Sequence, residues 1–147
     1  MQKSRFLFIC TGNSARSQMA EAFLRRHGGE WYEVFSAGLE PKGINPFTRQ
    51  VMAEKGYDLA GHRSKDVFEF LGMTHFGTII TVCSNAEARC PIFPGISTRL
   101  YWPFDDPAAC DGSDEEKLAA FRRVRDQIEA RILDWLKAVV SEEKSAS

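Results

Sequence analysis

The sequence has no long apolar run, no excess of either charge and no closely spaced pair of cysteines. No apolar run approaches the roughly 20 residues of a membrane span, and the first residues lack the pattern of a secretion signal. A formal net charge of -1 provides neither a basic field for nucleic acid nor a polybasic patch for a membrane. We therefore expect a cytoplasmic protein with small-molecule or specific protein partners.

The four cysteines are not spaced as zinc ligands. They include no Cys-x2-Cys pair, and the three histidines do not cluster with them. Without a secretion signal, thiols in a chain of this size are more often catalytic or metal-binding than disulfide-bonded. The sequence therefore indicates reactive thiols among its four cysteines, which are Cys10, Cys83, Cys90 and Cys110.

Strand-like runs alternate with helical patterns, which predicts one α/β domain over residues 1–147 with a frayed polar tail at 141–147. The first run is almost continuously apolar and suits a buried parallel strand. Residues that can cap helices stand at Asn45 before Pro46, at Ser64, and at Ser113 with Glu116. The predicted strands cover residues 4–9, 31–37, 76–82 and 97–101, and the predicted helices cover 14–27, 46–55, 65–71 and 113 onward.

The first strand, loop and helix carry the clearest chemical pattern. Apolar strand formers end at Cys10, and a polar loop with Gly12 and Asn13 leads into the helix. Loop N–H groups and the helix dipole favour an anion there, and together with Arg16 they favour the thiolate form of the cysteine. The planar fork of Arg16 can hold two oxygens of a tetrahedral oxyanion, and Ser17 can offer its hydroxyl to the sulfur. The pattern predicts a nucleophilic thiolate facing a bound oxyanion.

The spacing of Cys10 and Arg16 by itself also fits a buried cysteine followed by an exposed arginine. A nucleotide P-loop is disfavoured, because the loop has no Gly-Lys-Ser/Thr ending. The third predicted strand delivers Cys83 to its carboxyl end, where sites gather in an open parallel sheet, so Cys10 and Cys83 should face one crevice. If residues 83–90 formed an unbroken helix, Cys83 and Cys90 would lie roughly 10 Å apart, too far for a disulfide unless the segment unwinds.

Residues 10–21, with the pattern Cys-x5-Arg-Ser directly after the first strand, resemble the phosphate loop of the low-molecular-weight protein tyrosine phosphatase fold. Within that superfamily they most resemble the thioredoxin-coupled arsenate reductases. The similarity continues through nearly the whole chain, including residues 82–91 and the Asp-Asp-Pro-Ala pattern at 105–108. It implies a three-layer fold with a four-stranded parallel sheet flanked by helices. It also implies an oxyanion-binding loop, formed by Thr11, Gly12, Asn13, Ser14, Ala15, Arg16 and Ser17.

The resemblance implies that the protein reduces arsenate to arsenite through a relay of three thiols, as part of arsenic detoxification. Cys10 would attack arsenate, and Asp105 would protonate the departing oxygen; the sequence alone does not choose between this residue and Asp106. Cys83 would then attack Cys10 and release arsenite. Cys90 would attack Cys83, and thioredoxin would reduce the resulting Cys83–Cys90 disulfide.

Two other functions stay open at this point. In a tyrosine phosphatase, Cys10, Arg16 and Asp105 would hydrolyse a phosphoester through a phospho-enzyme, and Cys83 and Cys90 would be spectators. In a non-catalytic oxyanion binder or thiol redox sensor, Asp105 would have no purpose. Phosphate and sulfate are expected to compete with arsenate, and the chain is expected to be a monomer.

The resemblance implies no required cofactor, and it implies a structural potassium site beside the loop. The matching positions all carry oxygen in their side chains, which suits a hard cation. A capping and hydrogen-bond network would use the same residues, and this alternative stays open. The four positions are Asn13, Glu21, Ser36 and Asp66.

Overall fold

A four-stranded parallel sheet forms the centre of the protein, with strands in the order β2-β1-β3-β4. The structure is a computed structural model that describes residues 4–72 and 75–146, with side chains up to Val139. β1 lies inside the sheet, and its buried residues are those of the almost continuously apolar run. The strands are β1 (Ser4–Cys10), β2 (Tyr32–Gly38), β3 (Thr78–Thr81) and β4 (Thr98–Tyr101).

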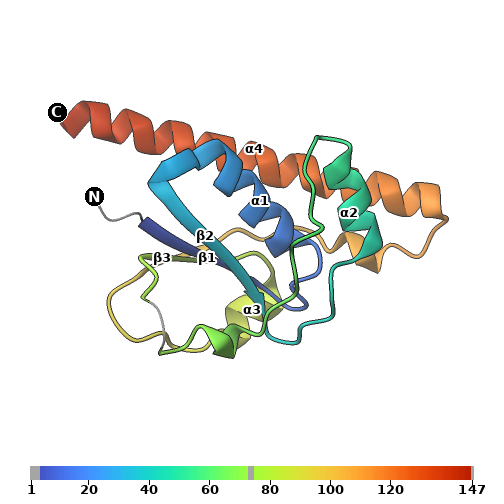
Figure 1. Cartoon of the computed structure of the whole chain (residues 1–147), viewed down its shortest axis with the longest axis horizontal. Helices are drawn as coiled ribbons and strands as arrows, with labels where there is room; N and C mark the ends of the chain where they lie inside the picture. The colour runs from blue at the N-terminus through green and yellow to red at the C-terminus, as the bar shows by residue number, and fades with distance from the viewer. Residues whose placement is uncertain (1–3, 73–74, 147) are drawn as a thin grey trace.

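In the described part of the chain, four α-helices and three short 3-10 turns connect and cover the strands (Figure 1). The long C-terminal helix α4 packs against both α1 and α2. The helices are α1 (Arg16–Gly28), α2 (Pro46–Ala53), α3 (Ser84–Arg89) and α4 (Asp114–Ala146), and the 3-10 turns are η1 (Gly29–Trp31), η2 (Val67–Glu69) and η3 (Pro107–Ala109).

The two faces of the sheet are covered differently. On one face, Trp135 of α4 packs edge-on against Phe6 of β1, with ring centroids 5.2 Å apart. Phe35 of β2 pairs with the residue after Phe6, so its side chain points to the opposite face. There it contacts Phe70 and Phe76, which belong to the segments around η2 and before β3. The predicted three-layer α/β arrangement is therefore confirmed.

Most of the predicted elements are confirmed to within a few residues. The four strands occupy the predicted segments. Asn45 caps α2, because its side-chain oxygen accepts from the backbone N–H of Phe47 at 2.8 Å, and Pro46 is the first helical residue. Ser113 and Glu116 form the predicted capping box at the start of α4.

The helix predicted over residues 65–71 is wrong. Only the single turn η2 forms there, and its cap is Asp66 rather than Ser64. The Ser64 hydroxyl instead donates to the backbone oxygen of Asn13 at 2.7 Å, and the backbone of Lys65 pairs with Gly38. These contacts hold the segment extended beside the first loop, so a helix cannot begin at residue 64.

The C-terminal helix is longer than the sequence prediction. α4 continues through residues 141–146, which were predicted as a frayed tail, and Ser147 lies outside the described residues. Residues 141–146 contain no glycine or proline, and Glu, Lys and Ala favour helix. Within residues 4–72 and 75–146, no helix has both the length and the apolar character needed to cross a bilayer.

A charged cluster joins α2 to α4 and generates a prediction about acid stability. Glu54 accepts from Arg122 at 2.6 Å and from Arg125 at 2.8 Å. These hydrogen bonds, that of Arg122 foremost, lower the pKa of Glu54 from an ordinary value of 4.5 to about 2. A lowered pKa in the folded state stabilises the protein above pH 4.5, and this contribution disappears as the pH falls toward 2.

We therefore expect Glu54→Gln to lower the free energy of unfolding at pH 7 and to flatten its dependence on pH below about 4.5. Urea unfolding followed by circular dichroism between pH 3 and 7 measures both effects. Glu30→Gln is the control, because Glu30 is exposed and has no ion-pair partner among the described residues. Parallel pH curves for the parent and Glu54→Gln would contradict the prediction.

Candidate active site

The sulfur of Cys10 lies in a buried polar setting at the carboxyl end of β1. The side chain is 2% exposed, and its Sγ lies 2.8 Å from the Ser17 hydroxyl. The backbone N–H of Asn13 donates to the same sulfur at 3.1 Å. A thiolate can only accept hydrogen bonds, and bonds to a charged acceptor are stronger than bonds to a neutral one. Both neighbours are therefore placed to hydrogen-bond a negatively charged sulfur, the species that would attack an oxyanion.

The loop after Cys10 owes its shape to Asn13 and Gly38. Asn13 is the one described non-glycine residue with a positive φ, 48°, a conformation that Asn tolerates better than most residues. Its side chain donates to Ser17 at 2.8 Å and accepts from the backbone N–H of Lys65 at 2.9 Å. A Cβ on Gly38 would lie 2.8 Å from the Asn13 backbone nitrogen, so only glycine lets β2 pass this close to the loop.

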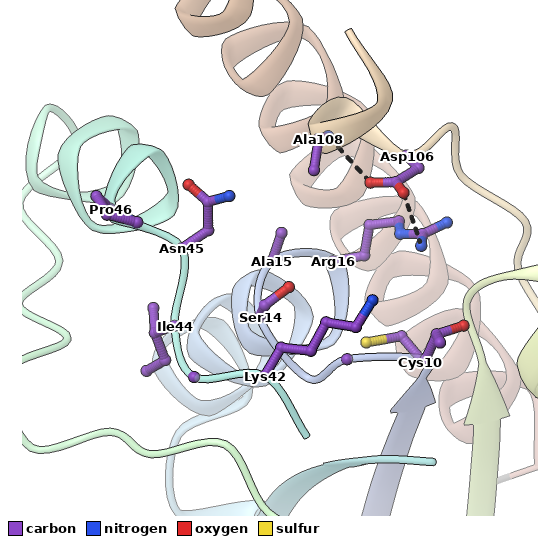
Figure 2. Close-up of a pocket in the computed structure, with 13 residues that line it drawn as sticks. Cys10, Ser14, Ala15, Arg16, Lys42, Ile44, Asn45, Pro46, Asp106 and Ala108 are labelled. Atoms are coloured by element: carbon purple, nitrogen blue, oxygen red, sulfur yellow. Dashed lines mark hydrogen bonds and ion pairs between the residues drawn. The ribbon is translucent and has the colours of Figure 1, made fainter. Parts of the chain in front are cut away.

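A cavity of about 390 Å³ opens at the loop, with Cys10 among its lining residues (Figure 2). Arg16 is the first residue of α1, and Ala15 at the N-cap makes no side-chain cap bond. The first N–H groups of this helix therefore have no side-chain cap, which suits an anion at this end. The cavity is lined by Cys10, Thr11, Gly12, Ser14, Ala15, Arg16, Lys42, Gly43, Ile44, Asn45, Pro46, Asp106 and Ala108.

Two of the predicted oxyanion-binding residues do not line this cavity. Asn13 and Ser17 are fully buried, and they hold the sulfur and the loop in place. Their role is indirect in this arrangement. The predicted residues that do line the cavity are Thr11, Gly12, Ser14, Ala15 and Arg16.

Arg16 reaches across to the loop that carries the two adjacent aspartates. Its guanidinium donates to the backbone oxygen of Phe104 at 3.0 Å and lies 3.9 Å from a carboxylate oxygen of Asp106. Asp106 also accepts from the Ala108 N–H at 3.0 Å, which caps η3. Asp105 is exposed, is not among the cavity-lining residues, and has no side-chain partner among the described residues. The acid role predicted for Asp105 is not tested by this arrangement.

Cys83 lies beside the first loop, as the strand positions predict. β3 pairs with β1 in parallel, with Thr81 opposite Ile9, so both strands end at the same edge of the sheet. The Cys83 sulfur is buried and lies 3.4 Å from the hydroxyl of Thr11, the residue that follows Cys10. The sheet therefore brings a second thiol next to the loop that holds the first. All four cysteines are free thiols.

Cys83 and Cys90 stand at the two ends of α3, where they form its N-cap and its C-cap. With helical geometry between them they lie roughly 10 Å apart, beyond the reach of a disulfide. Burial raises the pKa of the half-buried Cys90 thiol. α3 is tied to its surroundings by hydrogen bonds from Asn85 to Thr11 and from Thr81 to Glu87. A bond between the two thiols therefore requires α3 to unwind.

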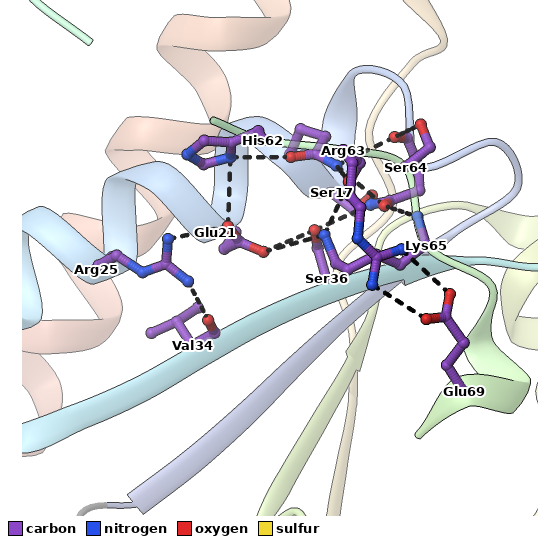
Figure 3. A network of polar contacts seen from close by, with 12 residues as sticks. Ser17, Glu21, Arg25, Val34, Ser36, His62, Arg63, Ser64, Lys65 and Glu69 are labelled. Atoms are coloured by element: carbon purple, nitrogen blue, oxygen red, sulfur yellow. Dashed lines mark hydrogen bonds and ion pairs between the residues drawn. The ribbon is translucent and has the colours of Figure 1, made fainter. Parts of the chain in front are cut away.

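Three of the four predicted potassium ligands form one hydrogen-bonded group (Figure 3). The Asn13 amide N–H donates to Ser36 at 2.9 Å, and the Ser36 hydroxyl donates to Glu21 at 2.8 Å. The carboxylate of Asp66 instead accepts from the Phe68 N–H at 2.9 Å. This is the network that the sequence analysis left open as the alternative to a metal site.

Basic side chains already surround the carboxylate of Glu21. Its carboxylate lies 3.2 Å from Arg25, 3.4 Å from His62 and 3.9 Å from Lys65. Burial lowers the pKa of both His62 and Lys65, and the charge of Glu21 acts in the opposite direction. Asn13 also turns its N–H, not its oxygen, toward Ser36. The residues as arranged do not fit a potassium ion well, and the potassium site stays a prediction.

Lys42 is a cavity residue that the sequence analysis did not select. Its backbone N–H donates to the Gly12 oxygen at 3.0 Å, and that of Glu40 donates to the Thr11 oxygen at 2.8 Å, so the segment after β2 runs alongside the first loop. Its position in the sequence could have indicated this role, because the carboxyl ends of neighbouring parallel strands meet at one edge of the sheet. A basic residue a few positions after β2 was therefore a candidate.

Comparison with known proteins matches one family model along nearly the whole chain. Residues 5–145 match the family model described as low molecular weight phosphotyrosine protein phosphatase. An arsenate reductase of Bacillus licheniformis is 42% identical over 132 residues, which cover 90% of this chain and 94% of that relative.

Solved structures of arsenate reductases have the same fold. A structure described as an arsenate reductase in the phosphate binding state superposes with a TM-score of 0.73 at 28% identity, covering 92% of this chain and 98% of the other. A thioredoxin-dependent arsenate reductase of Corynebacterium glutamicum superposes with a TM-score of 0.69 at 26% identity. That match covers 95% of this chain and 63% of the longer neighbour.

The contacts of Glu21 generate a prediction about potassium. We expect the thermal unfolding midpoint to be equal in potassium chloride and sodium chloride at the same ionic strength, because Arg25 and its neighbours already compensate the Glu21 carboxylate. Circular dichroism melts measure the two midpoints. A higher midpoint in potassium that disappears in Ser36→Ala would contradict this expectation and support the ion site.

Proposed function

This chain belongs to the low molecular weight phosphotyrosine protein phosphatase family, and we propose that within it the protein is an arsenate reductase that works through a relay of three thiols. The observation that carries the proposal is the position of Cys83 beside the loop that holds Cys10. A phosphatase needs only one nucleophile, whereas the two-electron reduction of arsenate needs a second thiol to form a disulfide with the first.

The first step uses the cavity. Arsenate enters with its oxygens toward the loop N–H groups and Arg16, and the thiolate of Cys10 attacks the arsenic atom. An arsenic–sulfur bond forms, an arsenic–oxygen bond breaks, and the departing oxygen leaves as water once it is protonated. Asp105 is the proposed proton donor, on the strength of the Asp-Asp-Pro-Ala pattern shared with the resembling family, and its exposed carboxylate has no side-chain partner among the described residues.

The second step transfers the electrons. The thiolate of Cys83 attacks the Cys10 sulfur, a Cys10–Cys83 disulfide forms, and the electron pair of the arsenic–sulfur bond moves to arsenic. Arsenic thereby changes from As(V) to As(III) and leaves as arsenite. The position of the Cys83 sulfur, 3.4 Å from Thr11, supports this order of events, because Thr11 directly follows Cys10.

The third step frees Cys10 for another cycle. Cys90 attacks Cys83, a Cys83–Cys90 disulfide forms, and Cys10 returns as a thiolate. This step requires α3 to unwind, since the cysteines cap opposite ends of the helix. Burial raises the pKa of Cys90, which disfavours its thiolate in the closed arrangement. A dithiol protein of the thioredoxin class then reduces the exposed disulfide.

Replacing individual cysteines tests the relay. With arsenate, thioredoxin, thioredoxin reductase and NADPH, we expect the parent to turn over many times. Cys83→Ser should release no arsenite, because nothing displaces Cys10 from arsenic. Cys90→Ser should release at most one arsenite per enzyme, because the Cys10–Cys83 disulfide accumulates. Arsenite is quantified in a single-turnover and a multiple-turnover assay.

The control for this experiment is Cys110→Ser, since Cys110 ends η3 and does not line the cavity. It should turn over like the parent. Full turnover of Cys83→Ser or Cys90→Ser would contradict the relay. An enzyme that produces no arsenite but hydrolyses an aryl phosphate without needing Cys83 or Cys90 would be a phosphatase.

The two aspartates make a second test. We expect Asp105→Asn to lower kcat for arsenate by roughly 10²-fold or more, the usual size of a lost general acid. Asp106→Asn should act mainly on KM and lower it, because the carboxylate that lies 3.9 Å from Arg16 no longer compensates the guanidinium that binds the oxyanion. Steady-state kinetics over a range of arsenate concentrations separate the two effects. A large loss of kcat in Asp106→Asn with normal kcat in Asp105→Asn would transfer the acid role to Asp106.

A further inference from the structure

Lys42 brings a second cation to the cavity from outside the oxyanion loop. Figure 2 shows its side chain extending from the segment after β2 toward the space between the Cys10 sulfur and Arg16. Arg16 and Lys42 are the cationic side chains among the described residues that line this cavity, and Asp106 is the acidic one. The position of Lys42 therefore adds a positive charge where the substrate is to bind.

The stem of Lys42 lies against the loop. A Cβ built on Gly12 would lie 3.3 Å from Cδ and 3.4 Å from Cγ of Lys42, so the aliphatic chain passes closely over Gly12. The backbone bond from Lys42 to the Gly12 oxygen, 3.0 Å long, holds the base of the side chain in place. Glycine at position 12 thus leaves room for the stem to approach the loop.

The ammonium group of Lys42 is available to a ligand. Lys42 is exposed, and its side chain has no hydrogen-bond or ion-pair partner among the described residues. The guanidinium of Arg16, in contrast, already contacts Phe104 and Asp106. A dianion in the cavity therefore meets Arg16, whose charge is partly compensated by Asp106, and Lys42, whose charge is not compensated.

We propose that Lys42 makes the site selective for inorganic tetrahedral oxyanions over phosphate esters. This inference rests on the proposed function only in placing an oxyanion at Cys10. Such an ion directs three oxygens to the loop and Arg16, and its fourth oxygen faces the cavity mouth. In arsenate or phosphate that oxygen can be charged and attracts the ammonium group. In an ester the same position carries an uncharged organic group, which has no electrostatic attraction to the ammonium group. This organic group must also fit beside the aliphatic stem of Lys42.

The selectivity is measured by binding, without turnover. In a background of Cys83→Ser, Cys90→Ser and Cys110→Ser, Cys10 is the sole thiol, and its alkylation by iodoacetamide reports whether the cavity is filled. Inorganic phosphate and phenyl phosphate serve as protecting ligands, and the concentration that halves the alkylation rate gives each Kd. Lys42→Met removes the charge but keeps a stem of similar shape, and Lys42→Arg keeps the charge.

We expect Lys42→Met to raise the Kd of inorganic phosphate about five- to tenfold, the size of one partly screened charge contact, and to change the Kd of phenyl phosphate less than twofold. Lys42→Arg should bind both ligands like the parent. Lys137→Met on the exposed side of α4 is the matched control and should change neither. Added salt should reduce the effect of Lys42→Met on phosphate.

An equal rise for both ligands would show a general electrostatic contribution and would overturn the selectivity. An unchanged Kd for phosphate would overturn the inference entirely. Since no arsenite is made in this assay, its result is independent of the relay. A protein that shows the selective loss of phosphate binding but fails to reduce arsenate would keep this inference and refute the proposed function.

Discussion

The buried side chain of Asn13 is the constraint on which the rest of the site depends. It holds its own backbone in the left-handed conformation that turns the N–H toward the Cys10 sulfur. Its amide also bonds to Ser17 and Ser36. Because Asn13 connects the sulfur, α1 and β2, hydrogen bonds within the protein set the shape of the loop. The oxyanion cavity is therefore largely preformed, which reduces the ordering needed when substrate binds.

The parallel sheet determines which thiols can meet. β1 and β3 are neighbours and end at the same edge, so Cys83 lies beside the loop that follows Cys10 although the two cysteines are far apart in sequence. Cys90 is kept at a distance by α3. This arrangement gives the proposed relay an order: the second thiol lies beside the loop that carries the first, and the third would take part only after α3 unwinds.

The same cradle suits a phosphatase and an arsenate reductase, since both must bind a tetrahedral oxyanion and present a thiolate to it. In the function proposed for this chain, the residues that separate the two chemistries lie outside the cradle. Cys83 and Cys90 come from the ends of α3, and Lys42 comes from the segment after β2. Family membership therefore accounts for the loop, whereas the proposed reaction would depend on residues supplied by neighbouring segments.

The sequence by itself determined the four strands, the helices α1, α2 and α4, the loop after Cys10 and the caps at Asn45 and Ser113, because these depend on residues close together in the chain. The same local patterns indicated a helix over residues 65–71 that does not form, and they left residues 84–89 undecided. Only the tertiary structure decided what distant segments do to one another. In the folded protein, Ser64 bonds to the loop and does not cap a helix. Asp106, and not Asp105, lies near Arg16, and Lys42 lines the cavity. Local spacing cannot foresee such contacts, because they arise where separate strands end at one edge of the sheet.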